Sequence, residues 1–136
     1  MPKLLALASV LAVLAMPTSP HAAPTFDGLW ATSKKDCRNQ DGPDSKTFID
    51  LENVIKGKPA PLVDSYENHC RVDRTTPAGD GLVLSTTCFE FWDDYNKGEN
   101  GRKVTIRLLS GPKDTIKIDG KSYLLCQRKS DLSKNR

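Results

Sequence analysis

The stretch that decides the fold runs from Tyr66 to Trp92, YENHCRVDRTTPAGDGLVLSTTCFEFW. Two strand-like segments flank the turn-forming run TPAGDG at residues 76–81, so we expect the chain to reverse there and form a β-hairpin. A turn centred on Gly79 places Cys70 directly opposite Cys88. Directly opposed residues of an antiparallel pair have Cα atoms about 4.5 or 5.5 Å apart, within reach of a disulfide. The turn and the cysteines thus indicate one register and predict a Cys70–Cys88 bridge.

The same register fixes the other facing pairs of the hairpin, which are Val72 with Thr86, Arg74 with Leu84, and Thr76 with Leu82. The second strand carries apolar side chains on both faces, because Leu82 and Leu84 alternate with Val83 and an aromatic cluster follows at residues 89–92. This pattern is typical of a strand that is covered on both sides, as in a barrel or a sandwich.

The two remaining cysteines, Cys37 and Cys126, are predicted to form a second bridge that staples the first strand region to the last. Four cysteines allow three connectivities, so a pairing of Cys37 with Cys70 stays open as an alternative. If the isoleucines of residues 115–118 face the core, a two-residue hairpin at Asp119-Gly120 turns Cys126 outward. We therefore expect the second bridge on the outer surface or at a strand-end bend.

Residues 1–23 have the layout of a secretory signal peptide. Lys3 gives a positive start, a predominantly apolar run covers residues 4–16, and a proline-containing break precedes Ala22 and Ala23. The run is shorter than the roughly twenty residues that span a bilayer. We expect a periplasmic or secreted protein with no stable membrane insertion after signal removal, and an uncleaved anchor is the alternative.

Removing this segment leaves 113 residues, the length of one domain. Loss of Lys3 lowers the net charge from +3 to +2, and the basic residues are scattered, so nucleic acid is not an expected partner. An exported chain with four cysteines is typical of disulfide-bonded proteins from an oxidising compartment. We expect a monomer with a single β-domain over residues 24–128 and a disordered polar tail over residues 129–136.

The mature chain is a series of short strand-like segments separated by turns. Besides the hairpin, strand patterns occur within residues 47–52, 103–108, 115–118 and 122–128. The stretch 93–102 is predicted to be a polar loop, and no helical periodicity of useful length follows the signal. The pattern predicts an all-β fold, either a small antiparallel barrel or a sandwich, with about seven to eight strands and two disulfides.

The start of the mature chain resembles the first strand of lipocalins and related calycin barrels. Those proteins carry a Gly-x-Trp signature, which Gly28 and Trp30 match. The resemblance implies a lipocalin-like barrel in which Trp30 closes one end and packs under an arginine of the last strand, for which Arg128 is the candidate. An ordinary buried tryptophan beside a turn glycine is the alternative.

The wider layout resembles a group of small, uncharacterised four-cysteine periplasmic proteins of Gram-negative bacteria. The features that carry this resemblance are Asp36-Cys37, Tyr66-Glu67 shortly before Cys70, Cys88-Phe89, and Tyr123 shortly before Cys126. The resemblance implies a compartment and a fold but no activity. Small periplasmic lysozyme inhibitors are the nearest functional analogy.

Few residues of the mature chain carry recognisable chemistry. His69 is its only histidine, and all four cysteines are expected in disulfides, so we expect neither a usual zinc site nor a thiol nucleophile, and no cofactor. Glu67 and Glu90 are expected to approach each other across the hairpin, which leaves glycoside hydrolysis as a minority hypothesis. The oxygen donors that begin at Asp94 lack the closing glutamate of a calcium loop, because Thr105 stands there.

This inventory favours a non-catalytic binding module that engages an envelope protein or polymer, in the manner of an inhibitor. Tryptophan and tyrosine are enriched at binding hot spots, so Trp92 and Tyr95 are candidate contact residues, together with Asp93 and Asp94. A role of Trp92 in capping the core is the alternative for that residue. The alternative function is a small apolar-ligand carrier with a calycin-type cavity inside the barrel.

Overall fold

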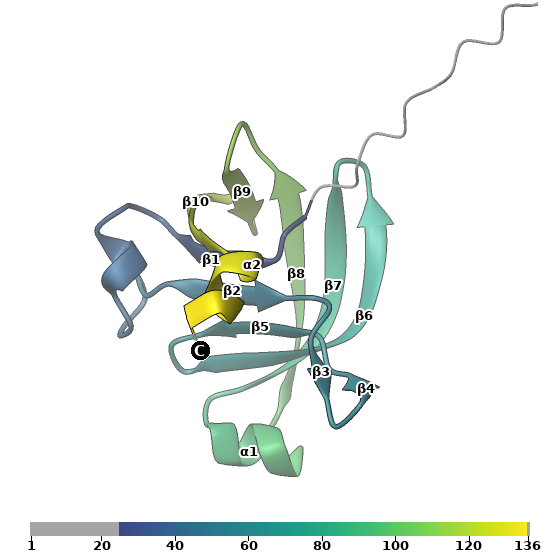
Figure 1. The fold of residues 1–136 in the computed structure, drawn as a ribbon. Coiled ribbons are helices and arrows are strands. Elements are labelled where there is room, and N and C mark those ends of the chain that lie inside the picture. Colours follow the sequence, from purple (N-terminus) through teal and green to yellow (C-terminus); the bar gives the residue numbers. More distant parts are fainter. Residues whose placement is uncertain (1–24, 136) are drawn as a thin grey trace, which may run out of the picture.

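The computed structural model describes residues 25–135 and forms a closed antiparallel barrel of eight strands (Figure 1). The predicted signal peptide at residues 1–23 lies outside the described residues. The barrel order is β1-β10-β9-β8-β7-β6-β5-β2, a meander closed by pairing of β1 with both β2 and β10. The strands are β1 (Gly28–Ala31), β2 (Thr47–Asp50), β5 (Leu62–Ser65), β6 (Asn68–Ala78), β7 (Gly81–Phe89), β8 (Arg102–Ser110), β9 (Thr115–Ile118) and β10 (Lys121–Arg128). The prediction of an all-β fold is confirmed as a barrel.

The hairpin of β6 and β7 has the predicted register at its cysteine end and a different one near its turn. Cys70 faces Cys88 and Val72 faces Thr86, but Arg74 then faces Ser85 instead of the predicted Leu84. The shift lies between Val72 and Arg74, so the residue between them, Asp73, is the extra residue of a β-bulge. The predicted facing pairs beyond the bulge were therefore wrong by one residue.

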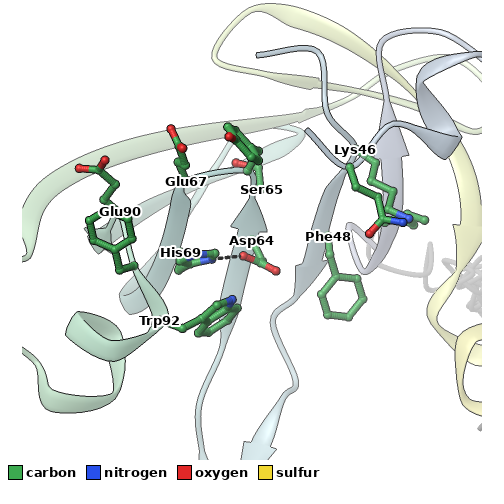
Figure 2. Close-up of a pocket in the computed structure, with 12 residues that line it drawn as sticks. Lys46, Phe48, Asp64, Ser65, Glu67, His69, Glu90 and Trp92 are labelled. Atoms are coloured by element: carbon green, nitrogen blue, oxygen red, sulfur yellow. Dashed lines mark hydrogen bonds and ion pairs between the residues drawn. The ribbon is translucent and has the colours of Figure 1, made fainter. Parts of the chain in front are cut away.

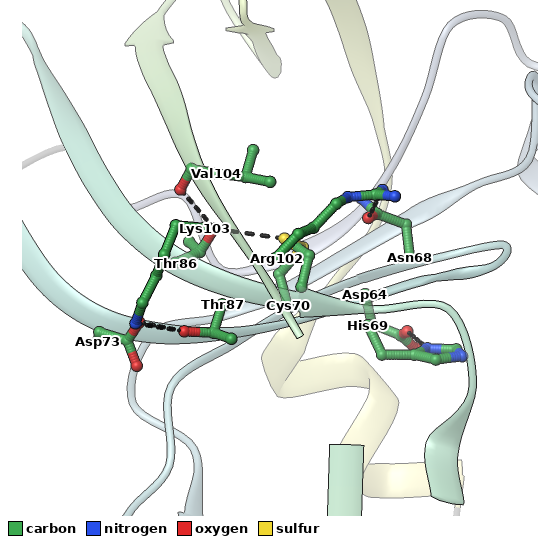
Figure 3. Close-up of a disulfide and its surroundings, with 11 residues drawn as sticks. Asp64, Asn68, His69, Cys70, Asp73, Thr86, Thr87, Arg102, Lys103 and Val104 are labelled. Carbon is green, nitrogen blue, oxygen red and sulfur yellow. Dashed lines mark hydrogen bonds and ion pairs between the residues drawn. A yellow bond between two sulfur atoms is a disulfide. The ribbon is translucent and has the colours of Figure 1, made fainter. Parts of the chain in front are cut away.

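Asp73 has partners that explain why the bulge forms at this residue. Its Oδ2 accepts hydrogen bonds from Thr87 Oγ1 at 2.6 Å and from Lys103 Nζ at 3.0 Å (Figure 3). Its Oδ1 accepts one from Arg71 Nε at 3.3 Å. Burial alone would raise the pKa of Asp73, but these three hydrogen bonds outweigh that effect and lower the pKa. The carboxylate of this bulge residue thus bonds to side chains of β6, β7 and β8.

The barrel interior is filled by apolar side chains and by the first disulfide. Cys70 and Cys88 are buried members of the core cluster, and their Cα atoms lie 3.9 Å apart. The largest buried apolar neighbours in the same cluster include Ile49, Leu84 and Leu108. Eight strands enclose a space just wide enough for side chains to fill it, so these residues account for the interior. The predicted Cys70–Cys88 bridge is confirmed and is a core element.

The Phe-Asp-Gly-x-Trp start closes one part of this core through specific contacts. Trp30 is buried and donates its indole N–H to the carbonyl of Phe26 at 2.8 Å, while Asp27 Oδ1 accepts the backbone N–H of Leu51 at 2.8 Å. Gly28 has φ +147°, and a Cβ there would lie 2.9 Å from the carbonyl oxygen of Gln127 on β10. Glycine is required because β10 approaches its backbone so closely.

The second predicted disulfide, Cys37–Cys126, is also confirmed. Cys37 lies in a short 3-10 helix, η1 (Asp36–Arg38), and its Cα is 5.6 Å from that of Cys126. On β10, Cys126 is the extra residue of a bulge, because Leu29 pairs with Gln127 while Trp30 pairs with Leu125. Both of its cysteines are half-buried and outside the core cluster, so the bridge lies on the barrel wall, as the alternation of β10 predicts.

The stretch predicted to be a polar loop at residues 93–102 contains a helix, α1 (Trp92–Lys97). Gly98 ends it in the left-handed conformation at φ +71°, and its N–H reaches the carbonyls of Asp94 and Tyr95. The helix covers Phe89, which points away from the core cluster and packs edge-on against Tyr95 with ring centroids 5.5 Å apart. The apolar residues on both faces of β7 are thus explained at this end by α1 (Figure 1).

The tail that was expected to be disordered is also folded. Residues after β10 form α2 (Lys129–Leu132) and a 3-10 turn, η2 (Ser133–Asn135). Lys129 Nζ binds Asp50 Oδ1 at 2.6 Å and lies 3.9 Å from Asp27 Oδ2. The hydrogen bond with Asp50 raises the pKa of Lys129, and burial raises the pKa of Asp27. Lys129 and Asp50 are 79 positions apart in the chain, so the periodicity of the sequence could not indicate their contact.

One element stands apart from the barrel. The strands β3 (Val54–Ile55) and β4 (Lys58–Pro59) form a separate two-stranded hairpin at the lower right of Figure 1. Its apolar residues are open to solvent, with Val54 58% and Ile55 49% exposed. Within residues 25–135, no helix has the length and hydrophobicity needed to cross a membrane.

Candidate functional site

A groove with a volume of about 530 Å³ lies on the outer face of the barrel (Figure 2). We call it the Trp92 groove. Its apolar wall is formed by Leu29, Phe48, Tyr66, Phe91 and Trp92. Its polar lining consists of Gln40, Lys46, Asp64, Ser65, Glu67, His69 and Glu90. The groove therefore combines aromatic surface with a set of carboxylates, which is the composition of a recognition site.

The alternation of the strands explains why the groove lies outside the barrel. On β2, β5 and β6, three groove residues are neighbours of core residues: Phe48 precedes Ile49, Asp64 follows Val63, and His69 precedes Cys70. Successive side chains of a strand point to opposite faces, so the core residues fix the groove residues on the other face. Glu90 and Phe91, which lie between β7 and α1, and Trp92, the first residue of α1, then form one side of the groove.

His69 and Asp64 form the floor of the Trp92 groove. His69 Nδ1 lies 2.6 Å from Asp64 Oδ1, and because a carboxylate accepts, Nδ1 donates. Burial raises the pKa of Asp64, while the hydrogen bond with His69 acts in the opposite direction. The two residues face each other across β5 and β6, where Asp64 pairs with His69. The pair holds the imidazole ring in a fixed orientation beneath α1.

Trp92 stacks on the imidazole ring of His69. The indole and imidazole rings stack with centroids 4.1 Å apart and an interplanar angle of 23°, and Tyr95 packs against the indole at 5.0 Å and 71°. Trp92 remains 44% exposed and the neighbouring Phe91 is 57% exposed. An indole held on one face by a histidine and still largely open to solvent is prepared for contact with a ligand without reordering.

Glu67 and Glu90 lie at one end of the groove and Lys46 at the other (Figure 2). The pairing of His69 with Phe89 brings the two glutamates close, since each lies one or two residues beyond that pair. Among the ion pairs of residues 25–135, neither glutamate has a cationic partner. The interaction with Glu67 raises the pKa of the Tyr66 hydroxyl, which places this carboxylate beside the phenol ring.

The backbone of Glu67 has a conformation that favours glycine. Tyr66 and Glu67 form the two-residue turn between β5 and β6, where Ser65 pairs with Asn68, and Glu67 has φ +49°. Lys56, Asn100, Asp114 and Asp119 have similar positive φ values, so this conformation is a shared feature of the turns of the described chain. The sequence therefore keeps a carboxylate at a position where glycine would be the easier residue.

The four predicted contact residues have different surroundings in the structure. Trp92 lines the groove, whereas Tyr95 is half-buried and supports Trp92 from below. Asp93 and Asp94 are in the first turn of α1 and are not among the groove-lining residues. Asp94 Oδ1 instead accepts a hydrogen bond from Asn100 Nδ2 at 3.0 Å, which ties the end of the helix to the following turn.

The two residues of the predicted barrel-closing pair, Trp30 and Arg128, also have different partners. Trp30 is buried in the core, but the Arg128 guanidinium is bound by Asp114 Oδ1 at 2.6 Å. Within the described part of the chain, the one cation–ring contact is Arg71 over Phe89 at 5.8 Å. Trp30 and Arg128 do border the same small cavity of about 150 Å³ at the barrel end. Arg128 is thus near the tryptophan without stacking on it.

Sequence reasoning missed most of the Trp92 groove. Phe48, Asp64 and Lys46 were not candidates, and His69 was considered only as the single histidine of the mature chain. One signal was present: Phe48 is an aromatic residue on β2 that alternates with the buried residues Thr47 and Ile49. An aromatic residue on the outer face of a strand indicates either a covering element or a binding surface.

Comparisons with known proteins give no relative from which a function can be transferred. No protein-family model matches the chain, and neither the curated proteins nor the solved structures contain a match. Among residues 25–135, no group of three or more histidine, cysteine or acidic side chains is arranged to hold a metal ion. The function therefore has to be argued from the groove itself.

Proposed function

We propose that this protein is an exported, non-catalytic binding module that engages an envelope protein or polymer through the Trp92 groove. The observation that carries the proposal is the pair Phe91 and Trp92, which are 57% and 44% exposed beside two glutamates without cationic partners. Exposed aromatic residues gathered in one concave site are the usual anchors of recognition surfaces.

The compartment is part of the proposal. Two disulfides, one of them inside the core, require an oxidising environment for the chain to fold. The predicted signal peptide at residues 1–23 provides the route to the periplasm or the exterior. A monomer with the Trp92 groove open on its barrel wall then presents this surface to other components of the envelope.

The carrier function remains the second candidate, and the core argues against it. A calycin-type carrier needs an apolar cavity inside the barrel, whereas the inward positions here belong to one packed cluster that includes the Cys70–Cys88 bridge. The groove lies on the opposite face of the same strands. We therefore place ligand binding on the barrel wall.

The test compares two double variants with matched exposure. Phe91→Ser with Trp92→Ser removes the groove aromatics, and serine is a favoured residue at the Phe91 position, which is the N-cap of α1. Val54→Ser with Ile55→Ser removes two apolar residues of similar exposure outside the groove. Each protein is immobilised and exposed to envelope extract of the producing cells, and bound material is identified by mass spectrometry.

We expect the first variant to lose partner capture and the second to retain it, with both retaining the circular dichroism spectrum of the wild type. Equal capture by all three proteins would exclude the groove as the binding surface. An apolar small molecule that co-purifies with the barrel and persists in the Phe91/Trp92 variant would favour the carrier. Hydrolysis of an envelope polymer that is lost in Glu67→Gln or Glu90→Gln would overturn the non-catalytic proposal.

A further inference from the structure

We propose that the Cys37–Cys126 bridge is a site of reversible thiol–disulfide exchange, at which a dithiol reductant frees the loop that supplies one end of the Trp92 groove. We call residues 32–46 the Cys37 loop. The exchange itself goes beyond the proposed function, whereas its effect on binding rests on that function. Three observations carry the inference: the composition of the loop, its few contacts with the barrel, and the different surroundings of the two bridges.

The Cys37 loop has no apolar side chains with which to pack on the barrel. Its sequence, TSKKDCRNQDGPDSK, contains no alanine, valine, leucine, isoleucine, methionine or aromatic residue. Ser45 is the one buried residue within it. The loop is the blue segment at the left of Figure 1, to the side of the strands. A segment that buries so little apolar surface does not offset the conformational entropy lost when it is ordered, so it depends on a cross-link.

The noncovalent contacts of the Cys37 loop with the rest of the barrel are weak. Within residues 25–135, its polar contacts outside the loop are an ion pair between Lys121 Nζ and Asp44 Oδ1 at 3.6 Å and a hydrogen bond from the Tyr66 N–H to Ser45 Oγ at 3.3 Å. Both partners of the ion pair are exposed, so it contributes little. The other hydrogen bonds of the loop join its own residues. The disulfide is therefore the main tether of the loop.

The two bridges differ in their access to solvent. Cys70 and Cys88 are 0% and 1% exposed inside the core cluster, so a reductant reaches them only after the barrel opens. Cys37 and Cys126 are half-buried on the barrel wall. The residues directly before and after Cys37 line a surface hollow of about 510 Å³, which gives a thiolate room to approach beside the bridge. Thiol–disulfide exchange requires such access to a sulfur atom.

The barrel has its own means of closure besides this bridge. Strand β1 pairs with β10 over four residue pairs and with β2 on its other side. The core cluster contains Trp30 and the Cys70–Cys88 bridge, and neither Cys37 nor Cys126 belongs to it. We therefore expect reduction to free the loop and to leave the barrel folded.

The exchange moves two electrons and two protons from the dithiol to the bridge. A thiolate of the reductant attacks one bridge sulfur, and the other bridge sulfur leaves as a thiolate that takes up a proton. The second thiol of the reductant then displaces the remaining protein sulfur from the mixed disulfide. The products are the free thiols of Cys37 and Cys126 and the disulfide of the reductant, and the reverse sequence restores the bridge.

Opening the bridge is expected to change one end of the Trp92 groove. Gln40 and Lys46 belong to the Cys37 loop and line the groove. Ser45 of the same loop accepts the N–H of Tyr66, a residue of the apolar wall. Figure 2 shows Lys46 on the opposite side of the groove from Trp92. The oxidised protein therefore presents the whole groove, and the reduced protein keeps only its Trp92 end in place.

The first test is reduction of the exported, folded protein with dithiothreitol, followed by alkylation with iodoacetamide and mass mapping of the cysteines. We expect Cys37 and Cys126 to be alkylated about a hundredfold faster than Cys70 and Cys88, because the core bridge reacts only in opened molecules. The far-UV circular dichroism spectrum should stay unchanged while only the first bridge is open. Equal rates, or loss of the spectrum with the first bridge, would overturn the exchange site.

The second test uses Cys37→Ser with Cys126→Ser as a permanently open bridge. We expect the N–H groups of Asn39 and Lys46, which form hydrogen bonds within the loop, to exchange with solvent about tenfold faster than in the wild type, while those of β7 remain protected. Asp44→Asn removes the ion pair of the loop and is the matched control, with no change expected. A double serine variant that retains loop protection, or that does not fold, would overturn the proposal.

The capture experiment with envelope extract separates this inference from the proposed function. We expect the double serine variant to capture less partner than the wild type, and capture equal to the wild type would overturn the control of the groove by the bridge. If the Phe91/Trp92 variant captures its partner as well as the wild type does, the proposed function falls. The relative reduction rates of the two bridges then still decide whether Cys37–Cys126 is an exchange site.

Discussion

The imidazole of His69 lies under the indole of Trp92 with 4.1 Å between the ring centroids, while its Nδ1 donates to Asp64. This relationship means that one histidine connects the barrel wall to α1. His69→Ala is expected to lower the free energy of unfolding by about 1 to 2 kcal/mol, because an aromatic pair and its buried area are lost. Urea denaturation followed by tryptophan fluorescence measures the loss.

Asp64→Asn is the control for that variant. Burial already disfavours the charged form of Asp64, and asparagine still offers an oxygen to His69, so this change is expected to cost little. A loss as large as that of His69→Ala would mean that the ion pair, and not the ring stack, holds α1 on the barrel.

We expect Asp73 to make a pH-dependent contribution to the free energy of unfolding. Its folded pKa is lowered relative to the unfolded value of about 3.9, so its contribution is fully present above that value and is lost as the pH falls through the folded pKa. Asp73→Asn is expected to cost about 1 kcal/mol at pH 7, a modest value because Lys103 is well exposed. The difference from the wild type should shrink between about pH 4 and the folded pKa.

Denaturation curves at a series of pH values test this, with Asp80→Asn as the control. Asp80 is an exposed residue of the turn between β6 and β7. If the cost of Asp73→Asn is the same at pH 7 and at pH 2, the carboxylate is not the group that stabilises the bulge.

Lys129 is predicted to hold two carboxylates together at the end of the barrel. Lys129→Met is expected to cost about 1 to 2 kcal/mol, because Asp50 loses its charged partner and its repulsion with Asp27 is no longer compensated. Adding Asp27→Asn should restore part of the loss, since asparagine removes one charge and retains the acceptor for the Leu51 N–H. A double-mutant cycle measures the coupling, and additive effects would contradict it.

Gly28 and Gly79 give a matched pair of glycine substitutions. Gly79→Ala is expected to cost about 1 kcal/mol, because φ is +57° but no atom lies within 4 Å of the new Cβ. Gly28→Ala should cost about 2 kcal/mol or more, because the new Cβ also meets the Gln127 carbonyl at 2.9 Å. Thermal or urea unfolding of the two variants compares them, and equal losses would show that β10 yields at this contact.

The all-β class and the Cys70–Cys88 bridge were predictable because they depend on patterns that the sequence displays, and Cys37–Cys126 followed as the remaining pair. Turn residues and strand alternation are local, and the facing positions of Cys70 and Cys88 checked the register independently. The bulge at Asp73 was not predictable, because the extra residue leaves the Cys70–Cys88 pairing intact and moves the centre of the turn only from Gly79 to between Gly79 and Asp80. The helix α1 escaped notice because its six residues are too few for a helical period to emerge.

Of the groove residues, the sequence indicated Trp92 as a contact residue and Glu67 and Glu90 as neighbouring carboxylates. The groove is assembled from β1, β2, β5, β6 and the segment before α1, together with the loop residues Gln40 and Lys46. No local pattern indicates that Phe48 and Trp92 share a surface. The folded tail was missed for the same reason, since the attraction of Lys129 to Asp50 acts between distant parts of the sequence.

Along the strands that line the groove, residues constrained by core packing alternate with residues that face the groove. Val63, Ile49 and Cys70 are constrained by packing, whereas their neighbours Asp64, Phe48 and His69 face the groove. A change at a groove position therefore alters the binding surface without opening a void in the core. The scaffold can accordingly be diversified: a library randomised at groove positions should retain folded members, so the same barrel can be redirected to new partners by evolution or by design.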